Sequence, residues 1–180
     1  LATSQLARIR VKNIPLTVCV DKIAASGGYL MATVANQIFA APFAIIGSIG
    51  VVSQVPNFNK LLKKHDIAIE EQTSGKYKRT ISILGEISNE GRAKHQETLE
   101  DIHALFKDYV SMYREGIDIE KVATGEYWPA KKAIELKLVD KLGTSDDYLV
   151  QQAKTCDIIE VKYEIKKSIS DKLSKGAMQI

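Results

Sequence analysis

The sequence is poor in cysteine: it has only Cys19 and Cys156, which form neither a disulfide framework nor the spacing of a metal site. Both lie in apolar or strand-like stretches, so we expect them to be small buried side chains. A strong excess of either charge is also lacking, since the formal net charge is +3 and the basic residues are dispersed. This distribution argues against nucleic-acid binding, which favours basic residues clustered with aromatic ones.

Charged residues are absent from residues 23–59, yet this stretch does not resemble a membrane span. A span needs about 20 mostly apolar residues that stay helical. Serine, asparagine, glutamine, proline and four glycines interrupt the stretch, so we expect buried strands and turns. With 180 residues and 45% hydrophobic content, the chain is long enough for one packed core. Because Leu1 is not a methionine and a helical pattern is already under way there, we expect a fragment of a longer protein.

Short elements alternate in the first half of the chain. The pattern predicts strands at 16–20, 37–40 and 67–69, helices at 27–34 and 57–64, and a further apolar segment at 45–52. Such alternation favours an α/β fold with a mainly parallel sheet. By itself it also allows a doubly wound fold.

The second half begins with a long amphipathic helix. Ser88 is expected as its N-cap, and apolar residues follow at steps of three and four. These residues are Leu99, Ile102, Phe106, Tyr109 and Tyr113. A second helix is expected from Pro129 to about residue 136, and residues 144–147 (TSDD) form a capping-box-like start for a third. Residues 158–165 are expected to form a closing strand, and residues 166–180 a tail.

Ser26 is the first candidate for chemistry, because it lies among small residues and before two glycines in residues 25–29 (ASGGY). Gly27 and Gly28 permit backbone angles closed to other residues and let a substrate approach the main chain. The Gly27 N–H is then able to bind an oxyanion beside the Ser26 hydroxyl. The alternative is a strand-to-helix turn without chemistry, in which Tyr29 packs the helix.

A serine nucleophile needs a base, and the candidates are lysines and histidines. A neutral lysine serves if its pKa falls by about three units, which takes about 4 kcal/mol of desolvation or charge repulsion. Lys76 and Lys78 share a face if their segment is extended, so spacing does not choose between them. His65 lies at a predicted helix end, whereas His95 and His103 lie on the long helix. A Ser–His triad therefore stays open.

Three ordered motifs lie at residues 20–29 (VDKIAASGGY), 40–50 (AAPFAIIGSIG) and 74–78 (SGKYK). Together they resemble the signal peptide peptidase A family of Ser–Lys peptidases, over a stretch that ends near residue 153. The resemblance implies a crotonase-like α/β spiral fold, shared with Clp proteases. Residues 1–165 are then a catalytic domain that lacks its N-terminal part.

The resemblance also implies roles for single residues. Ser26 is the expected nucleophile, Lys78 the general base, and the Gly27 N–H part of the oxyanion hole. Ser48 is expected to hydrogen-bond the lysine amine, with a simple turn residue as its alternative. The glycine that completes the family's oxyanion hole belongs to a segment before this chain, and no cofactor or metal is implied. Relatives have a glycine at the helix end where this chain has Lys137, so we expect positive φ there.

By the same resemblance, we expect a serine endopeptidase of the bacterial inner membrane, anchored there and with its catalytic domain in the periplasm. Its expected substrates are residual signal peptides or other short hydrophobic or unfolded peptides. Its expected partners are copies of the same chain, in an oligomer where Lys78 completes a neighbour's site; nucleic acid is not expected. Two alternatives stay open: a catalytically silent oligomeric scaffold, and an acyl-CoA enzyme of the wider crotonase superfamily.

Overall fold

The structure, a computed structural model, describes residues 1–163. By their contacts, residues 1–148 form one compact unit, and the residues from 149 onward belong to a second. The domain boundary predicted at residue 165 and the predicted tail at 166–180 lie outside the described residues.

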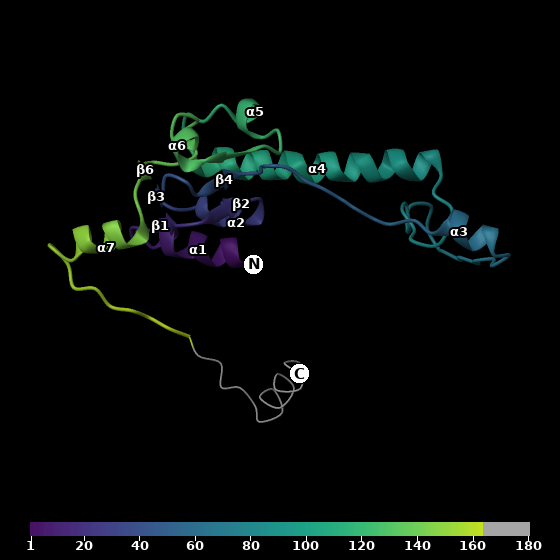
Figure 1. Ribbon diagram of the computed structural model, residues 1–180, viewed down its shortest axis with the longest axis horizontal. Helices are drawn as coiled ribbons and strands as arrows, with labels where there is room; N and C mark the ends of the chain where they lie inside the picture. Colours follow the sequence, from purple (N-terminus) through teal and green to yellow (C-terminus); the bar gives the residue numbers. More distant parts are fainter. Residues whose placement is uncertain (164–180) are drawn as a thin grey trace, which may run out of the picture. The chain divides into compact units, whose positions relative to one another are not determined.

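Within the described residues, six short strands form two sheets in the first unit (Figure 1). One sheet has the order β1 (Thr17–Val20), β3 (Gln37–Ala40) and β6 (Lys141–Leu142), and the other has the order β2 (Ile23–Ala25), β4 (Ile45–Gly47) and β5 (Tyr127–Pro129). All neighbours are parallel except β4 and β5. The predicted mainly parallel pairing is confirmed, but it is divided between two sheets.

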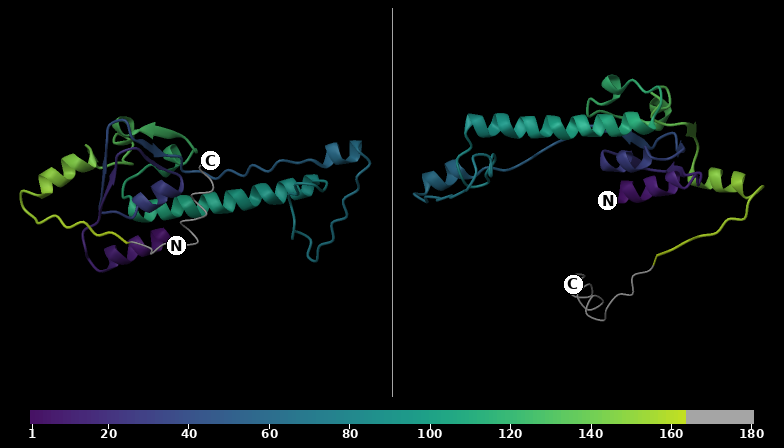
Figure 2. Two further views of the ribbon diagram at one scale, coloured as in Figure 1. Left: turned by 60° about the horizontal axis from the view of Figure 1, so that its bottom comes forward. Right: turned by 180° about the vertical axis from the view of Figure 1, so that it is seen from behind.

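Helices precede, connect and follow these strands along the chain (Figures 1 and 2). They are α1 (Ala2–Val11), α2 (Gly27–Ala32), α3 (Asn59–Lys64), α4 (Asn89–Tyr113), α5 (Ile119–Val122), α6 (Ala130–Ala133) and α7 (Ser145–Gln152). The predicted start of α4 is confirmed, because the Ser88 hydroxyl accepts a hydrogen bond from the Gly91 N–H at 2.9 Å. The predicted capping box of α7 is also confirmed: Thr144 and Asp147 each accept the other's backbone N–H.

The core lies between α2, the two sheets and the C-terminal half of α4. The Tyr29 side chain is fully buried, and its hydroxyl donates a hydrogen bond to the Leu138 carbonyl at 3.1 Å. Ile38 of β3, Ile46 of β4 and Val110 of α4 are also fully buried. One end of α4 is therefore anchored in the core, while Figures 1 and 2 show its N-terminal half extending away from the sheets.

A partly buried ion pair ties the end of α4 to β3. Arg114 is only 8% exposed and donates two hydrogen bonds to the Asp140 carboxylate, at 2.9 and 2.8 Å. The same carboxylate accepts the Ile38 N–H at 2.7 Å. Burial acts to raise the pKa of Asp140, but the bonds from Arg114 and Ile38 and the Arg114 charge outweigh it, so this pKa is lowered.

Several sequence expectations are wrong in detail. Residues 67–69 are exposed and form no strand, since no neighbouring strand of the described chain pairs with them, and residues 158–163 form none either. Cys19 is only half-buried and Cys156 is exposed, so neither is a core residue. The helix expected to reach residue 136 ends at residue 133.

Lys137 has φ 60°, which confirms the expectation of positive φ there. The charge-free stretch forms strands and one helix up to Gly47, where β4 ends, and residues 52–58 are exposed rather than buried. Among the helices of the described chain, none combines the length and the apolar character needed to cross a bilayer.

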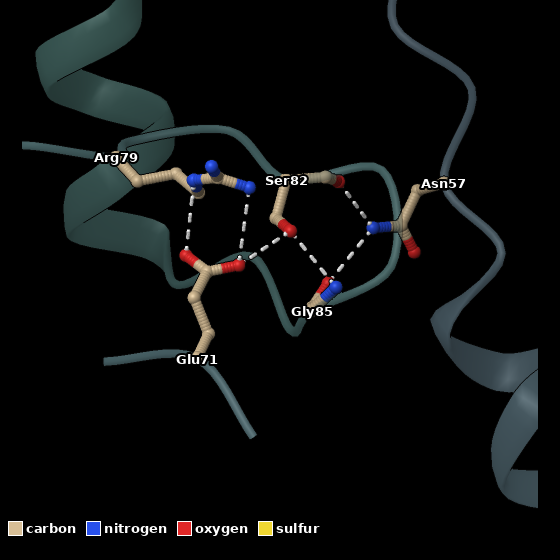
Figure 3. A network of polar contacts seen from close by, with 5 residues as sticks. All are labelled: Asn57, Glu71, Arg79, Ser82 and Gly85. Carbon is tan, nitrogen blue, oxygen red and sulfur yellow. Dashed lines mark hydrogen bonds and ion pairs between the residues drawn. The ribbon is translucent and has the colours of Figure 1, made fainter. Parts of the chain in front are cut away.

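Residues 52–88, here called the arm, connect β4 to α4, carry α3 and are mostly exposed. A polar network closes the end of the arm on itself (Figure 3). The Asn57 side-chain amide donates to the carbonyls of Ser82 and Gly85, at 2.8 and 3.0 Å. The Ser82 hydroxyl donates to Glu71 at 3.0 Å, and Glu71 also pairs with Arg79. The loop between residues 71 and 85 is thereby fixed.

Candidate active site

Ser26 lies where β2 ends and α2 begins. Its backbone has φ 51° and ψ −121°, in a region that costs a residue other than glycine about 1–3 kcal/mol. Two hydrogen bonds hold this conformation: the Ser26 N–H donates to the Gly47 carbonyl at 2.8 Å, and the Leu30 N–H donates to the Ser26 carbonyl at 2.9 Å. Strain of this kind gathers at functional sites, and here it leaves the serine exposed.

Gly27 and Gly28 leave open space beside the Ser26 backbone. A Cβ atom added at either position would meet no atom within 4 Å. Neither glycine has positive φ, so the expectation that they supply angles closed to other residues is wrong; Ser26 itself takes such angles. The Gly27 N–H has no hydrogen-bond partner in the described chain, and it is free to meet a ligand.

Ser48 comes to the same place because β2 and β4 are parallel neighbours, with Ala25 paired to Gly47. Parallel strands end at the same edge of a sheet, so the residues that follow them are close together. Ser48 also has positive φ, 52°, and its N–H donates to the Glu126 carbonyl at 2.6 Å. The residue just before β5 therefore holds the backbone of the second serine.

Ser26, Gly27 and Ser48 line one cavity of about 670 Å³. Its remaining walls come from the chain after Ser48, from α4 and from the loop before β5. These lining residues are Gly50, Val51, Val52, Ile102, His103, Phe106, Thr124 and Gly125. The volume is within the range of ligand pockets, and the lining combines a few polar groups with apolar side chains, as such pockets do.

Lys78 is not among the residues that line this cavity. It is exposed and lies on a turn, in which its N–H donates to the Gly75 carbonyl at 3.1 Å, rather than on the extended segment considered from the sequence. This turn contacts α4 at Glu90, which accepts the Tyr77 hydroxyl at 2.9 Å. Glu90 and the cavity residue Ile102 are roughly 18 Å apart along the helix axis. A lysine side chain does not span that distance, so one chain does not bring Lys78 to Ser26.

The two lysines of the turn differ in their partners. Lys76 forms an ion pair with Glu90 at 2.7 Å, and its amine lies over the Tyr77 ring. Hydrogen bonding to Glu90, then to Tyr77, and the Glu90 charge raise the pKa of Lys76. That is the wrong direction for a general base. Lys78 forms no ion pair within the described chain.

The three histidines are placed differently. His65 is exposed at the end of α3, as expected, and His95 shares a hydrogen bond of 2.9 Å with the Ser53 hydroxyl. His103 lines the cavity of Ser26. Sequence reasoning kept His103 only as one possible triad member. Its spacing from Leu99 and Phe106, on the apolar stripe of α4, is the signal that would have placed it inward.

No group of three or more His, Cys, Asp or Glu side chains suited to a metal is present in the described part of the chain.

Comparison with known proteins gives a consistent result. The family described as Peptidase family S49 matches residues 8–158. A probable protease SohB of Haemophilus influenzae is 52% identical over 176 residues, which cover 98% of this chain and 50% of the relative. Another, of Buchnera aphidicola, is 57% identical over 152 residues, covering 84% of this chain and 50% of that protein. The chain thus spans about half the length of these curated relatives.

Among solved structures, an enoyl-CoA hydratase from Polaromonas sp. JS666 is similar with a TM-score of 0.40 and 17% identity, over 85% of this chain and 42% of that one. This likeness is too distant to place any residue. The predicted resemblance to this peptidase family is confirmed by the family match and by the protease relatives, and the predicted α/β fold class is confirmed by the family match and by the alternation of helices with mainly parallel strands.

Proposed function

Because this chain belongs to peptidase family S49, we propose that it carries the nucleophilic half of a Ser–Lys endopeptidase site. Ser26 is the nucleophile, Lys78 of a neighbouring copy is the general base, Ser48 positions the lysine amine, and the Gly27 N–H binds the oxyanion. The observation that carries this proposal is the cavity that gathers Ser26, Gly27 and Ser48 from two separate strand ends.

The placement of Lys78 supports a site shared between chains. Its turn lies beside the N-terminal end of α4, away from the cavity of its own chain, on an arm that Figure 3 shows to be internally braced. An exposed lysine on such an arm reaches an adjacent copy without refolding of either chain. Burial in the neighbour's cavity then favours the neutral amine, because desolvation disfavours the charged one.

The proposed reaction is acyl transfer. The Lys78 amine takes the proton of the Ser26 hydroxyl as the serine oxygen attacks the peptide carbonyl. The carbonyl oxygen becomes an oxyanion, to which the Gly27 N–H donates a hydrogen bond. Lys78 returns the proton to the departing amine, which leaves an acyl group on Ser26. Water, deprotonated by Lys78, then attacks this ester and frees the carboxylic acid and the serine.

The cavity lining suggests the substrate class. Val51, Val52, Ile102 and Phe106 give the cavity apolar walls near the nucleophile. Such walls suit hydrophobic side chains of an unfolded peptide, and residual signal peptides are of this kind. The proposed setting is the periplasmic face of the bacterial inner membrane, with the full-length protein anchored there.

A silent scaffold is the second candidate, and the separation of Lys78 from Ser26 within one chain is the observation that favours it. The deciding experiment is cleavage of a hydrophobic signal peptide by the full-length protein, read by mass spectrometry. We expect Ser26→Ala and Lys78→Ala each to abolish turnover, and Lys76→Ala to retain most of it. Equal loss with Lys76→Ala would overturn the choice of base, and a wild type without activity would favour the scaffold.

A further inference from the structure

We propose that His103 is a substrate-positioning residue, whose Nε2 atom hydrogen-bonds to the main chain of a peptide bound in the Ser26 cavity. The inference rests on the proposed peptidase function and adds a residue to it. His103 lies on α4 next to Ile102 and one turn before Phe106, and all three line the cavity that also contains Ser26 and Ser48.

The His103 Nε2 atom is buried and has no hydrogen-bond partner in the described chain. A buried ring nitrogen is a donor or an acceptor in either tautomer, and leaving it unpaired is unfavourable. Two other described side-chain atoms share this state, on Thr33 and Arg114, but neither residue is placed at the Ser26 cavity. Because Nε2 is closed to solvent in this conformation, it meets a ligand only after the imidazole turns toward the cavity that His103 lines, and the ligand then supplies the missing partner.

A peptide main chain is the partner that fits best. Each of its residues, proline aside, offers one donor and one acceptor, so it satisfies Nε2 whichever tautomer is present. His103 comes from α4, whereas Ser26 and Ser48 follow strands, so a peptide in the cavity meets polar groups from both. A base role fits less well. The structure has no hydrogen bond between His103 and Ser26, and no described carboxylate bonded to the imidazole as in a triad.

The test uses the full-length protein and three substitutions of His103. Phenylalanine keeps a ring of similar size but removes the nitrogen, and we expect kcat/KM to fall about tenfold, mainly through KM. Glutamine places an amide near the position of Nε2, and we expect it to restore most of the loss. Asparagine places its amide near Nδ1 instead, and we expect no restoration.

Thermal unfolding separates this role from a structural one. Because phenylalanine removes an unpaired buried nitrogen, we expect His103→Phe to be at least as stable as the wild type. A lowered Tm with unchanged KM would overturn the proposal in favour of a structural role. A loss at saturating peptide as complete as that of Ser26→Ala would overturn it in favour of a catalytic base.

A binding measurement keeps this test independent of turnover. Fluorescence anisotropy of a labelled signal peptide is compared between Ser26→Ala and the Ser26→Ala/His103→Phe double variant. We expect about tenfold weaker binding by the double variant. Equal binding by the two would contradict the role of His103 even if Ser26 proves to be the nucleophile. Weaker binding would support it even if the proposed Ser–Lys chemistry fails.

Discussion

Mixing two inactive variants tests whether the site is shared between chains. Copies with Ser26→Ala keep Lys78, and copies with Lys78→Ala keep Ser26, so neither forms a working site alone. In a head-to-tail oligomer, a working site needs Ser26 from one copy and Lys78 from the next. With equal amounts and random association, half of the copies carry each intact group. The recovered activity is then about a quarter of the wild-type value.

The expected recovery of a quarter of the activity depends on the separation of Lys78 from the Ser26 cavity of its own chain. Lys78 lies on a turn held to Glu90, roughly 18 Å along α4 from the cavity residue Ile102. If that separation holds in the assembled protein, no chain supplies both groups to one site. Recovery should therefore be greatest at equal proportions and fall to zero with either variant alone.

The assay is peptide cleavage by the full-length variants after they are co-expressed in equal amounts and purified together, so that the random mixture of oligomers is kept. A matched control mixes wild type in equal amounts with the Ser26→Ala/Lys78→Ala double variant. A site shared between chains again leaves about a quarter of the activity, whereas a site within one chain leaves about half. No recovery in the first mixture, together with half activity in the control, would refute the shared site.

Two further substitutions test the scaffold around the site. Asp140→Asn leaves the buried Arg114 without its carboxylate partner, and we expect the free energy of unfolding, measured in urea, to fall by about 2–3 kcal/mol. The loss is smaller than for a fully buried pair because the Asp140 side chain is 33% exposed. The pKa of Asp140 is lower in the folded state than its unfolded value of about 3.9. The Asp140 carboxylate therefore stabilises the folded state above about pH 3.9, and this stabilisation is lost as pH falls through the folded pKa. In that acidic range the wild type should lose more stability than Asp140→Asn. Gly91→Ala improves helix propensity by about 1 kcal/mol, but the added Cβ would lie 2.5 Å from the Thr80 carbonyl oxygen of the arm. We therefore expect the arm to be displaced and peptide cleavage to be reduced, while peptide binding stays intact. An unchanged kcat would contradict this.

The sequence was sufficient for elements with strong local signals. Gln37–Ala40 and the start of α4 at Ser88 were predicted correctly, because a β-rich run and an N-cap serine act within a few residues. The prediction of a strand at residues 67–69 was wrong, because a strand also needs a neighbouring strand, and strand pairing is not visible in local composition. The division of the strands into two sheets has the same origin.

The candidate site was predicted in part, and the limits have a physical reason. Ser26 and Ser48 follow strands that prove to be parallel neighbours, so motif reasoning and topology agree on their proximity. The position of Lys78 depends on how the arm is braced, which local sequence does not describe. His103 was kept only as an alternative, because its inward direction depends on which part of α4 packs against the core.

The backbone strain of the two serines shows how distant segments determine the site. Glycine would relieve the positive φ at Ser26 and Ser48, but it would also remove both hydroxyls. The serines are held instead by carbonyls: that of Gly47 for Ser26 and that of Glu126 for Ser48. Glu126 directly precedes β5, whose antiparallel pairing with β4 fixes its position. The conformation of the second hydroxyl therefore depends on a strand far along the chain, whose own motif gives no hint of this role.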